Sequence, residues 1–401
     1  MSILLNIKRA MHNSALDTAF AIIDKIHVFL SVRQLYSKLI TFNFTEEDLS
    51  LNIKCIKDGN KFNGKTKTVM WFIPAFNQKF AGISTIFKLA RYLSSQKIKQ
   101  YFVILGDTEF ANKNRLDILK GAYGLELKMT EVSINPEIKS LPHVDVSIAT
   151  RWDTAYYSLK FNSTYKKLYL IQDDERLFYP ASEIRSLVEE TYRFGFTGIT
   201  NSMSLKEMYK NEFNGKCFYF FQPLDETFSN FRMRNKSSIS KIWFYSRKRA
   251  KRNGFALGML GLREIKRRHP EIEVYFAGDN SHKPKYFVYK DLGYLSMDKY
   301  KSLLDECDVG LYFIFSNHPG IIPFENMAHG CITLTNRRSK NPELKDLYNC
   351  VMCNSTPSGI ADAFDKVFNN KELRKLLISN GFKTINSKIK YDYTKVMHKV
   401  L

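Results

Sequence analysis

The chain has 401 residues, 44% hydrophobic and 25% charged, which are the proportions of a folded globular protein and exclude a disordered or fibrous one. At this length a single hydrophobic core is not expected, and two domains are the natural prediction. With 61 Lys and Arg against 40 Asp and Glu, the formal net charge is +21, which attracts anions such as nucleic acid, anionic lipid headgroups or a nucleotide diphosphate. The excess is spread along the chain, with one dense run at Arg247–Arg252, and this distribution argues against a nucleic-acid groove.

The six cysteines follow no disulfide framework, and several lie inside apolar runs. We therefore expect reduced cysteines in the core of a cytosolic protein. Cys350 and Cys353 form a C-x-x-C, but no second Cys or His pair stands at zinc spacing. A buried strand is the better prediction for this segment than a metal site.

Residues 1–66 are predicted to form an N-terminal helical extension. Apolar residues recur at helical spacing through residues 1–40, with Lys and Arg between them. Two interpretations stay open: an amphipathic surface that touches an anionic membrane, or helices that cap the following domain. No apolar run approaches the ~20 residues that span a bilayer. The N-terminus also lacks the features of a signal peptide, so we expect a cytoplasmic location.

Residues 67–228 alternate apolar runs with helical patterns, which predicts a parallel sheet covered on both faces. The expected strands are Thr68–Phe76, Gln100–Leu105, Val144–Thr150, Lys167–Gln172, Gly198–Asn201 and Cys217–Phe221. The expected helices are Ser84–Ser95, Asn114–Ala122, Glu183–Phe194 and Ser204–Asn211.

A polar linker, residues 229–240, precedes a second α/β series at residues 241–375. Its expected strands are Lys241–Tyr245, Glu273–Ala277, Val309–Phe313, Cys331–Thr335 and Val351–Cys353. Its expected helices are Phe255–Arg268, Met297–Glu306, Pro323–His329 and Ala361–Phe368. Residues 376–401 are helical in pattern.

The first expected strand leads into a loop that contains Ala81 and Gly82. Glycine lets the backbone approach a ligand, and Ser84 or Thr85 is expected to cap the helix that follows. A strand, a glycine loop and a helix N-terminus together form an anion site, although a bare β–α turn has the same sequence pattern.

Two polar groups follow later strands of the same half. Asp153 and Thr154 can form an N-cap pair that opens the next helix. Carboxylates at a strand end can bind a divalent metal, but Asp173, Asp174 and Glu175 are contiguous and lack a D-x-D spacing. We therefore expect these three to lie on the acceptor side or to be structural.

The basic run follows the first strand of the second half. A guanidinium can hold two oxygens of a pyrophosphate leaving group at once, and Arg247 is the first candidate for this role. Arg249 or Arg252 is expected to support it. A solvated basic face is the ordinary alternative. Gly278 ends the next strand and is expected to border the same ligand.

A buried strand over Asp308–Phe315 is followed by a loop with His318 and Gly320 and by a helix that opens near Pro323. Glu325 falls in the first turn of that helix, where its carboxylate can accept hydrogen bonds from two neighbouring hydroxyls, as on a ribose. The alternative is that Glu325 only complements the helix dipole.

Several of these segments resemble the WsaF-type rhamnosyltransferases, which are retaining GT-B glycosyltransferases of family 4. The similar motifs are Ala81–Ile86, Ala149–Ala155, Gln172–Pro180, Phe244–Asn253 and His318–Gly330. The E-x7-E pair that is usual in the wider family 4 has Asn317 in place of its first glutamate here, which agrees with the His-Pro pattern of the WsaF-like branch. The Gly-Gly loop of the WsaF-like proteins has Ala81 in place of its first glycine.

The resemblance implies an α/β protein of the GT-B fold, with two Rossmann-like domains facing a central cleft and a C-terminal helix that crosses back to the first domain. It implies catalytic roles for Arg247, Glu325 and Asp153. Donor binding would involve the residues Ala81, Gly82, Arg247, Arg249, Arg252, Asn253, Gly278, His318, Gly320 and Glu325. Acceptor binding would involve the residues Thr154, Asp173, Asp174 and Glu175.

The implied reaction moves rhamnose from dTDP-rhamnose to a hydroxyl of a cell-surface polysaccharide or lipid-linked glycan, with retention of configuration. It requires neither a metal nor another cofactor. The expected partners are a nucleotide sugar, a glycan acceptor and an anionic surface at the inner face of the plasma membrane, and not nucleic acid. Two alternatives stay open, a UDP- or GDP-sugar as donor and a catalytically silent GT-B scaffold in a polysaccharide assembly complex.

Overall fold

The computed structural model describes residues 43–76, 81–106, 130–221, 224, 238–279, 283–337, 342–388 and 392–401. Contacts divide the chain into two compact units, Met1–Leu51 and Asn52–Leu401. Most of the expected N-terminal extension, the expected helix Asn114–Ala122 and residues 229–237 of the linker lie outside the described residues.

Helix α2 (Glu46–Gly59) opens with reciprocal capping bonds inside the first unit. The Thr45 amide donates to Asp48 Oδ2 at 2.9 Å, and the Asp48 amide donates to Thr45 Oγ1 at 3.2 Å. Two amides that the helix cannot satisfy itself are thereby paired, which sets where the helix starts.

The first sheet has seven strands in the order β3-β2-β1-β4-β5-β6-β7. The strands are β1 (Thr68–Pro74), β2 (Lys99–Leu105), β3 (Thr130–Ile134), β4 (Val144–Ala149), β5 (Thr164–Ile171), β6 (Thr197–Thr200) and β7 (Cys217–Tyr219). All neighbouring pairs are parallel. Their carboxyl ends therefore lie along one edge of the sheet.

The second sheet has six strands in the order β10-β9-β8-β11-β12-β13. The strands are β8 (Lys241–Ser246), β9 (Glu273–Gly278), β10 (Lys290–Asp291), β11 (Val309–Tyr312), β12 (Ile332–Asn336) and β13 (Val351–Cys353). These pairs are parallel too. Two parallel α/β sheets confirm the predicted fold class.

Strand β1 shows why the apolar runs are continuous. Val69, Trp71 and Ile73 pack into one core, and Met70 and Phe72 pack into the core on the opposite face. All five side chains are fully buried. A strand covered on both faces needs apolar side chains at every position, so alternation disappears.

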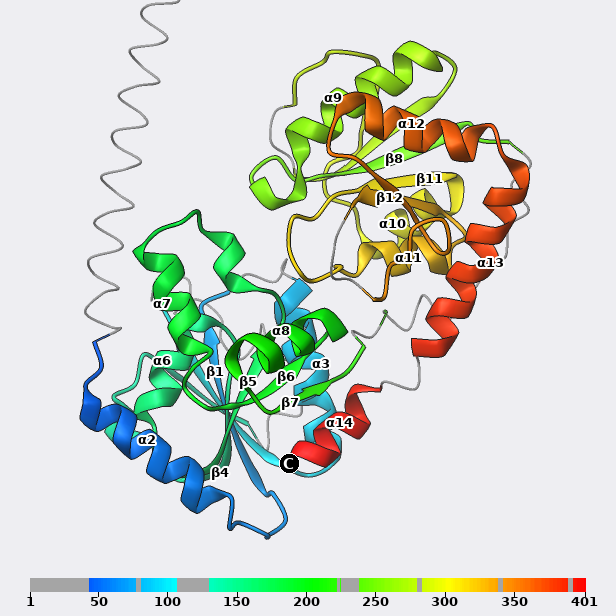
Figure 1. Cartoon of the computed structure of the whole chain (residues 1–401). Helices are drawn as coiled ribbons and strands as arrows, with labels where there is room; N and C mark the ends of the chain where they lie inside the picture. The colour runs from blue at the N-terminus through cyan, green and yellow to red at the C-terminus, as the bar shows by residue number, and fades with distance from the viewer. Residues whose placement is uncertain are drawn as a thin grey trace, which may run out of the picture. The chain divides into compact units, whose positions relative to one another are not determined.

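Helices cover the faces of both sheets. They are α3 (Ala81–Ser95), α6 (Trp152–Lys160), α7 (Glu183–Thr191), α8 (Met203–Phe213), α9 (Phe255–Arg268), α10 (Met297–Glu306), α11 (Ile322–Ala328), α12 (Pro357–Phe368), α13 (Lys371–Lys388) and α14 (Tyr393–Val400). Figure 1 shows α9 and α12 side by side over one face of the second sheet, with α10 and α11 at its other face.

The C-terminal residues return to the first sheet. Met397 and Val400 of α14 lie in the same core as α3 and β1. The Leu401 carbonyl accepts hydrogen bonds from Thr66 Oγ1 at 2.5 Å and from Lys166 Nζ at 2.8 Å. The last helix is thus packed and hydrogen-bonded against the first α/β half.

Three elements differ from the sequence prediction. Helix α3 begins at Ala81, so the expected caps Ser84 and Thr85 lie inside it and that prediction was wrong. The edge strands β3 and β10 were not predicted. Helix α6 is the helix that the N-cap alternative for Asp153 and Thr154 implied. Strand β3 reads Thr-Glu-Val-Ser-Ile, and such a short half-polar edge strand has little apolar signal.

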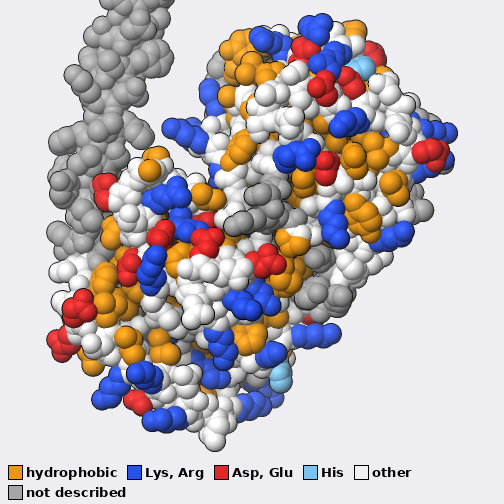
Figure 2. All heavy atoms as spheres, viewed as in Figure 1, with side chains coloured by type: hydrophobic (Ala, Val, Ile, Leu, Met, Phe, Trp, Pro, Cys, Tyr) orange, Lys and Arg blue, Asp and Glu red, His pale blue; other side chains and the backbone are white. Residues whose placement is uncertain are grey.

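The C-x-x-C segment contains the buried strand β13, as predicted, and none of the six cysteines forms a disulfide. Among the described residues, no helix is both long and apolar enough to span a bilayer. Figure 2 shows Lys and Arg spread over the visible face with Asp and Glu between them, in keeping with the diffuse positive charge.

Candidate functional site

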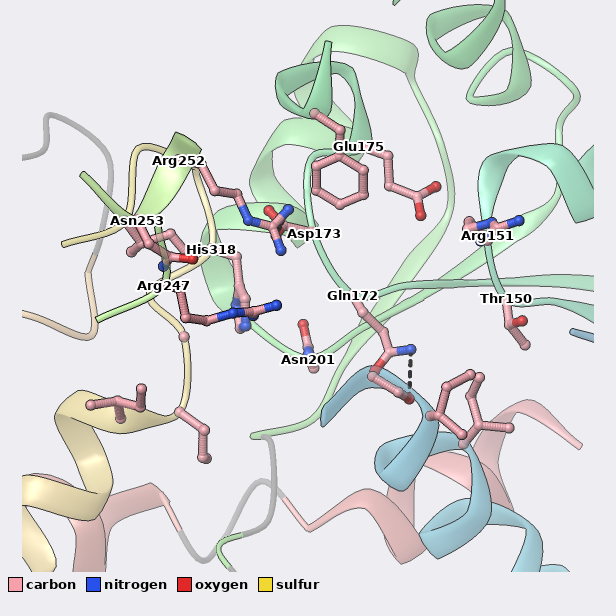
Figure 3. A pocket seen from close by; sticks show the side chains of 18 of the residues that line it. Thr150, Arg151, Gln172, Asp173, Glu175, Asn201, Arg247, Arg252, Asn253 and His318 are labelled. Atoms are coloured by element: carbon pink, nitrogen blue, oxygen red, sulfur yellow. Dashed lines mark hydrogen bonds and ion pairs between the residues drawn. The ribbon is translucent and has the colours of Figure 1, made fainter. Parts of the chain in front are cut away.

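A cavity of about 410 Å³ is lined by residues at the carboxyl ends of strands from both sheets (Figure 3). On the first-sheet side, Thr150 follows β4, Gln172 follows β5 and Asn201 follows β6. On the second-sheet side, Arg247 follows β8 and Ile314 follows β11. Parallel α/β sheets bind their ligands at this edge, so the cavity is the candidate site.

Arg247 is a cation of the cavity wall that has no carboxylate partner among the described residues. Its guanidinium is half-buried, and its Nη1 lies 3.5 Å from the Tyr245 hydroxyl, a long hydrogen bond. Within the described part of the chain no carboxylate forms an ion pair with it, and Asp279 acts on it only through a longer-range Coulombic attraction. Burial raises the pKa of Tyr245, so this neighbour is a neutral phenol. The positive charge of Arg247 is therefore available to an anion in the cavity.

Arg252 also lines the cavity but already has partners. Its Nη1 lies 3.1 Å from Asp173 Oδ2, and its guanidinium stacks 4.3 Å above the Phe178 ring. The Asn253 side chain lines the cavity as well and donates to the Phe313 carbonyl at 3.1 Å. The structure thus separates Arg247 from Arg252, which the sequence had grouped.

Arg249 and Gly278 are not among the described residues that line the cavity. The exposed Arg249 is placed by its main chain, whose amide donates to Asp279 Oδ2 at 3.2 Å. Gly278 has φ +151° and lies against the Ser246 backbone, where a Cβ would come within 2.2 Å of the carbonyl oxygen. Its role is to let β9 end close to β8.

The loop after β11 brings His318 and Gly320 to the cavity wall. Gly320 has φ +74°, and a Cβ there would lie 2.0 Å from the Tyr312 hydroxyl, so only glycine fits. Asn317 does not line the cavity, and its Nδ2 donates to Asp174 Oδ2 at 2.9 Å. An amide can make this contact, whereas the glutamate of the usual family pattern would place two carboxylates together.

Glu325 lies in the first turn of α11 and is buried, and the Tyr300 hydroxyl donates to its Oε2 at 2.9 Å. Burial and the adjacent carboxylate raise the pKa of Tyr300, which therefore stays protonated as the donor. Glu325 is not among the described residues that line the cavity, although His318 and Gly320 in the preceding loop are. Its predicted ribose contact stays a prediction.

Asp153 and Thr154 are engaged locally. Thr154 Oγ1 accepts from the Thr150 and Arg151 amides at 3.0 and 3.1 Å and donates to the Arg151 carbonyl. Asp153 pairs with the Arg151 guanidinium. Neither is among the described residues of the cavity wall. The N-cap of α6 is Arg151, so Asp153 and Thr154 stabilise the first turn of this helix from inside it and are not the predicted N-cap pair.

The three acids after β5 have three different environments. Asp173 lines the cavity, accepts from the Ser316 hydroxyl and pairs with Arg252. Asp174 is buried against Arg176, whose Nε and Nη2 donate to its two oxygens at 2.8 Å each. Glu175 lines the cavity and accepts from the Trp152 amide at 2.7 Å and the Tyr169 hydroxyl at 3.1 Å. Burial raises the pKa of Glu175 to about 8.

We expect Glu175→Gln to flatten the pH dependence of stability. The folded carboxyl keeps its proton up to about pH 8, whereas its ordinary value is 4.5, so the wild type loses stability as pH rises between these values. Urea unfolding at pH 5, 6, 7 and 8 measures this effect. The free energy of unfolding of the variant, relative to that of the wild type, should rise by up to about 1.4 kcal/mol per pH unit. Parallel curves would mean that Glu175 is already ionised in the folded protein.

Gly82 lines the cavity from the first turn of α3, and Ala81 precedes it, with its side chain outside the described residues. The Gly82 carbonyl accepts from Gln172 Nε2 at 3.1 Å, which Figure 3 marks with a dashed line. Asn77–Phe80, the rest of the expected loop, lies outside the described residues.

Sequence reasoning did not select four polar residues of the wall, which are Thr150, Arg151, Gln172 and Asn201. Each stands at or just after the carboxyl end of a strand, and that position was the signal that could have identified them. Within the described ranges, no group of three His, Cys, Asp or Glu side chains is placed to hold a metal ion.

The comparisons with known proteins fit this geometry. Residues 240–365 match the family described as WsaF, C-terminal domain. Over 337 residues the chain is 33% identical to the O-antigen biosynthesis protein RfbC of Myxococcus xanthus, covering 80% of this chain and 26% of that protein. The chain therefore spans about a quarter of the length of this relative.

Solved structures share the fold at lower identity. HepE of Anabaena in complex with UDP has a TM-score of 0.63 at 11% identity, over 82% of this chain and 98% of that one. TarM has a TM-score of 0.64 at 9% identity, over 84% and 98%. Sucrose-phosphate synthase from Thermosynechococcus elongatus has 0.61 at 9%, over 83% and 97%. The chain therefore has the predicted GT-B fold, and its residues 240–365 are similar to the WsaF C-terminal domain.

Proposed function

We propose that this chain is a glycosyltransferase that moves a sugar from a nucleoside diphosphate to a hydroxyl of a glycan during O-antigen or related polysaccharide synthesis. The observation that carries the proposal is Arg247, a half-buried guanidinium with no described carboxylate partner in a cavity at the strand ends of both sheets. A leaving diphosphate needs such a preorganised cation, because its negative charge grows as the glycosidic bond breaks.

The relatives support the same class of substrate. The RfbC relative is named for O-antigen biosynthesis. HepE was solved with UDP and with UDP-glucose, at an identity that carries only the fold to this chain. In the proposed reaction the bond from the sugar's anomeric carbon to the diphosphate breaks, and the acceptor oxygen forms the new bond. The acceptor proton leaves with the released diphosphate, so no strong protein base is required.

The resemblance adds finer parts to the proposal. Rhamnose is the proposed donor sugar and dTDP its carrier, with retention of configuration and Glu325 on the ribose hydroxyls. We assign to Arg247, and not to a metal ion, the role of neutralising the negative charge of the diphosphate. The proposed acceptor is a polysaccharide or a lipid-linked glycan.

A thermal-shift screen of the purified chain against dTDP-rhamnose, UDP-glucose, UDP-galactose and GDP-mannose tests the donor. A ligand that binds only the folded protein raises the free energy of unfolding, by about 2.7 kcal/mol at a hundredfold excess over Kd, and therefore raises the melting temperature. The largest shift should come from dTDP-rhamnose, and release of dTDP with a glycan acceptor should follow. Shifts without turnover would favour a silent scaffold, and no shift with any nucleotide sugar would contradict the proposal.

A further inference from the structure

Polar side chains line the cavity from three adjacent strands of the first sheet. Thr150, Gln172 and Asn201 follow β4, β5 and β6, which are neighbours in that sheet. Thr150 Oγ1 donates to the Phe72 carbonyl at 2.8 Å, and Gln172 Nε2 donates to the Gly82 carbonyl at 3.1 Å. Two of the three are therefore held in place by the backbone of the first α/β half.

Only one of the two polar atoms of the Gln172 amide has a hydrogen-bond partner among the described residues. Its Nε2 donates to the Gly82 carbonyl, whereas its Oε1 is buried and accepts no hydrogen bond from any described residue. A buried acceptor without a donor is unfavourable, so a ligand that supplies a hydroxyl at this point gains affinity. At this point the cavity therefore favours a ligand group that donates a hydrogen bond over one that only accepts.

The charged groups on this side of the cavity are already neutralised. Arg151 Nε donates to Asp153 Oδ1 at 2.6 Å, and Asp173 pairs with Arg252 at 3.1 Å. Glu175 is buried, and its pKa of about 8 leaves it mostly protonated at pH 7. Unlike the side that holds Arg247, this side offers no described cation that is free to pair with an anion.

Apolar side chains complete the wall. Phe76, Ile83 and Ile86 line the cavity beside the polar group. A sugar ring presents hydroxyls at its rim and C–H bonds on its faces, which matches a wall of mixed polar and apolar residues. A carboxylate or phosphate on the same ring would meet the Gln172 oxygen without a cation to compensate for its lost hydration.

We propose that the first-sheet side of the cavity binds the acceptor as an uncharged sugar residue and that Gln172 selects it through a hydroxyl. The inference rests on the proposed function and adds the chemical class of the acceptor. Sugars with a carboxylate or phosphate at the binding end are excluded from this side.

The test uses saturation-transfer NMR on the full chain at pH 7. The probes are methyl glycosides of glucose, galactose and mannose and the three matching uronates, which differ only by a carboxylate at C6. At least one neutral glycoside should bind about tenfold more tightly than its uronate. Equal or tighter binding of the uronates, or no saturable binding of any neutral glycoside, would overturn the inference.

Variants at Gln172 make the test specific to this side chain. Gln172→Met keeps the size but removes both the Oε1 acceptor and the Nε2 donor to the Gly82 carbonyl, and should weaken binding of the neutral glycoside about tenfold. Gln172→Lys should bring the matching uronate closer to its neutral partner, which a merely structural role would not do. Gln96→Met changes an exposed glutamine just after α3 and should leave the binding of both probes unchanged.

Unchanged binding of the neutral glycoside by Gln172→Met would refute the role of Gln172. The same samples are also tested for melting shifts with dTDP-rhamnose and UDP-glucose. Nucleotide-sugar binding together with failure of the glycoside arm rejects this inference alone. Failure of the nucleotide arm would reject the proposed function instead.

Discussion

Arg247→Ala should lower kcat/KM for sugar transfer by about 10²- to 10³-fold while leaving the melting temperature nearly unchanged. The guanidinium is half-buried, lines the cavity and has only a 3.5 Å contact to the neutral Tyr245 hydroxyl. Its removal therefore breaks no ion pair with a described residue, and the loss falls on the charge that develops in the leaving diphosphate. Steady-state kinetics with the donor identified by the thermal-shift screen measure the effect.

Two further variants separate this role from net charge. Arg247→Lys keeps the charge but loses the planar fork that holds two oxygens, so its activity should lie between wild type and alanine. Arg263→Ala removes an exposed arginine of α9 and should leave the kinetics unchanged. An Arg247→Ala enzyme with wild-type turnover would show that the diphosphate binds elsewhere.

Glu325→Gln should raise KM for the nucleotide sugar by about tenfold or more, with little loss of stability. The amide oxygen still accepts from the Tyr300 hydroxyl, now 2.9 Å from the carboxylate, but it is a weaker acceptor for the two ribose hydroxyls. The effect should appear equally with free nucleotide, because the proposed contact is to the ribose. Isothermal titration with dTDP and UDP measures it directly.

Glu325→Ala is expected to combine two effects. It removes the ribose contact, and it leaves the Tyr300 hydroxyl without its acceptor, which costs about 1–3 kcal/mol. Tyr300→Phe removes only the second interaction and serves as the control for stability. If Glu325→Gln binds nucleotide as tightly as wild type, Glu325 is a helix-dipole or packing residue, the alternative that its first-turn position always allowed.

The two sheets were predictable from sequence because burial acts on every residue of a covered strand. Val69–Ile73 and Ile242–Phe244 are fully buried, and their unbroken apolar runs report this without knowledge of any partner. The helices Phe255–Arg268 and Met297–Glu306 match their predicted bounds for the same reason, since one apolar stripe at helical spacing is a local property.

The composition of the site depended on contacts that no local pattern contains. Asn317 donates a hydrogen bond to Asp174, 143 residues away in the sequence. Arg252 forms an ion pair with Asp173, whereas Arg247, in the same basic run, forms none with a described residue. A basic run or an acidic cluster looks the same in the sequence whether its charges pair with each other or face a ligand.

The amino-acid sequence by itself thus determined two parallel α/β halves and the strand ends where a ligand would bind, because hydrophobic periodicity is short-range. Only the tertiary structure decided that the Thr154 hydroxyl bonds to the backbone at the start of its own helix. It also decided that Gln172 lines the cavity and that Arg247 has no ion-pair partner there among the described residues. The pairing of polar groups is set by distances of a few ångströms between segments remote in the chain, and such distances exist only after folding.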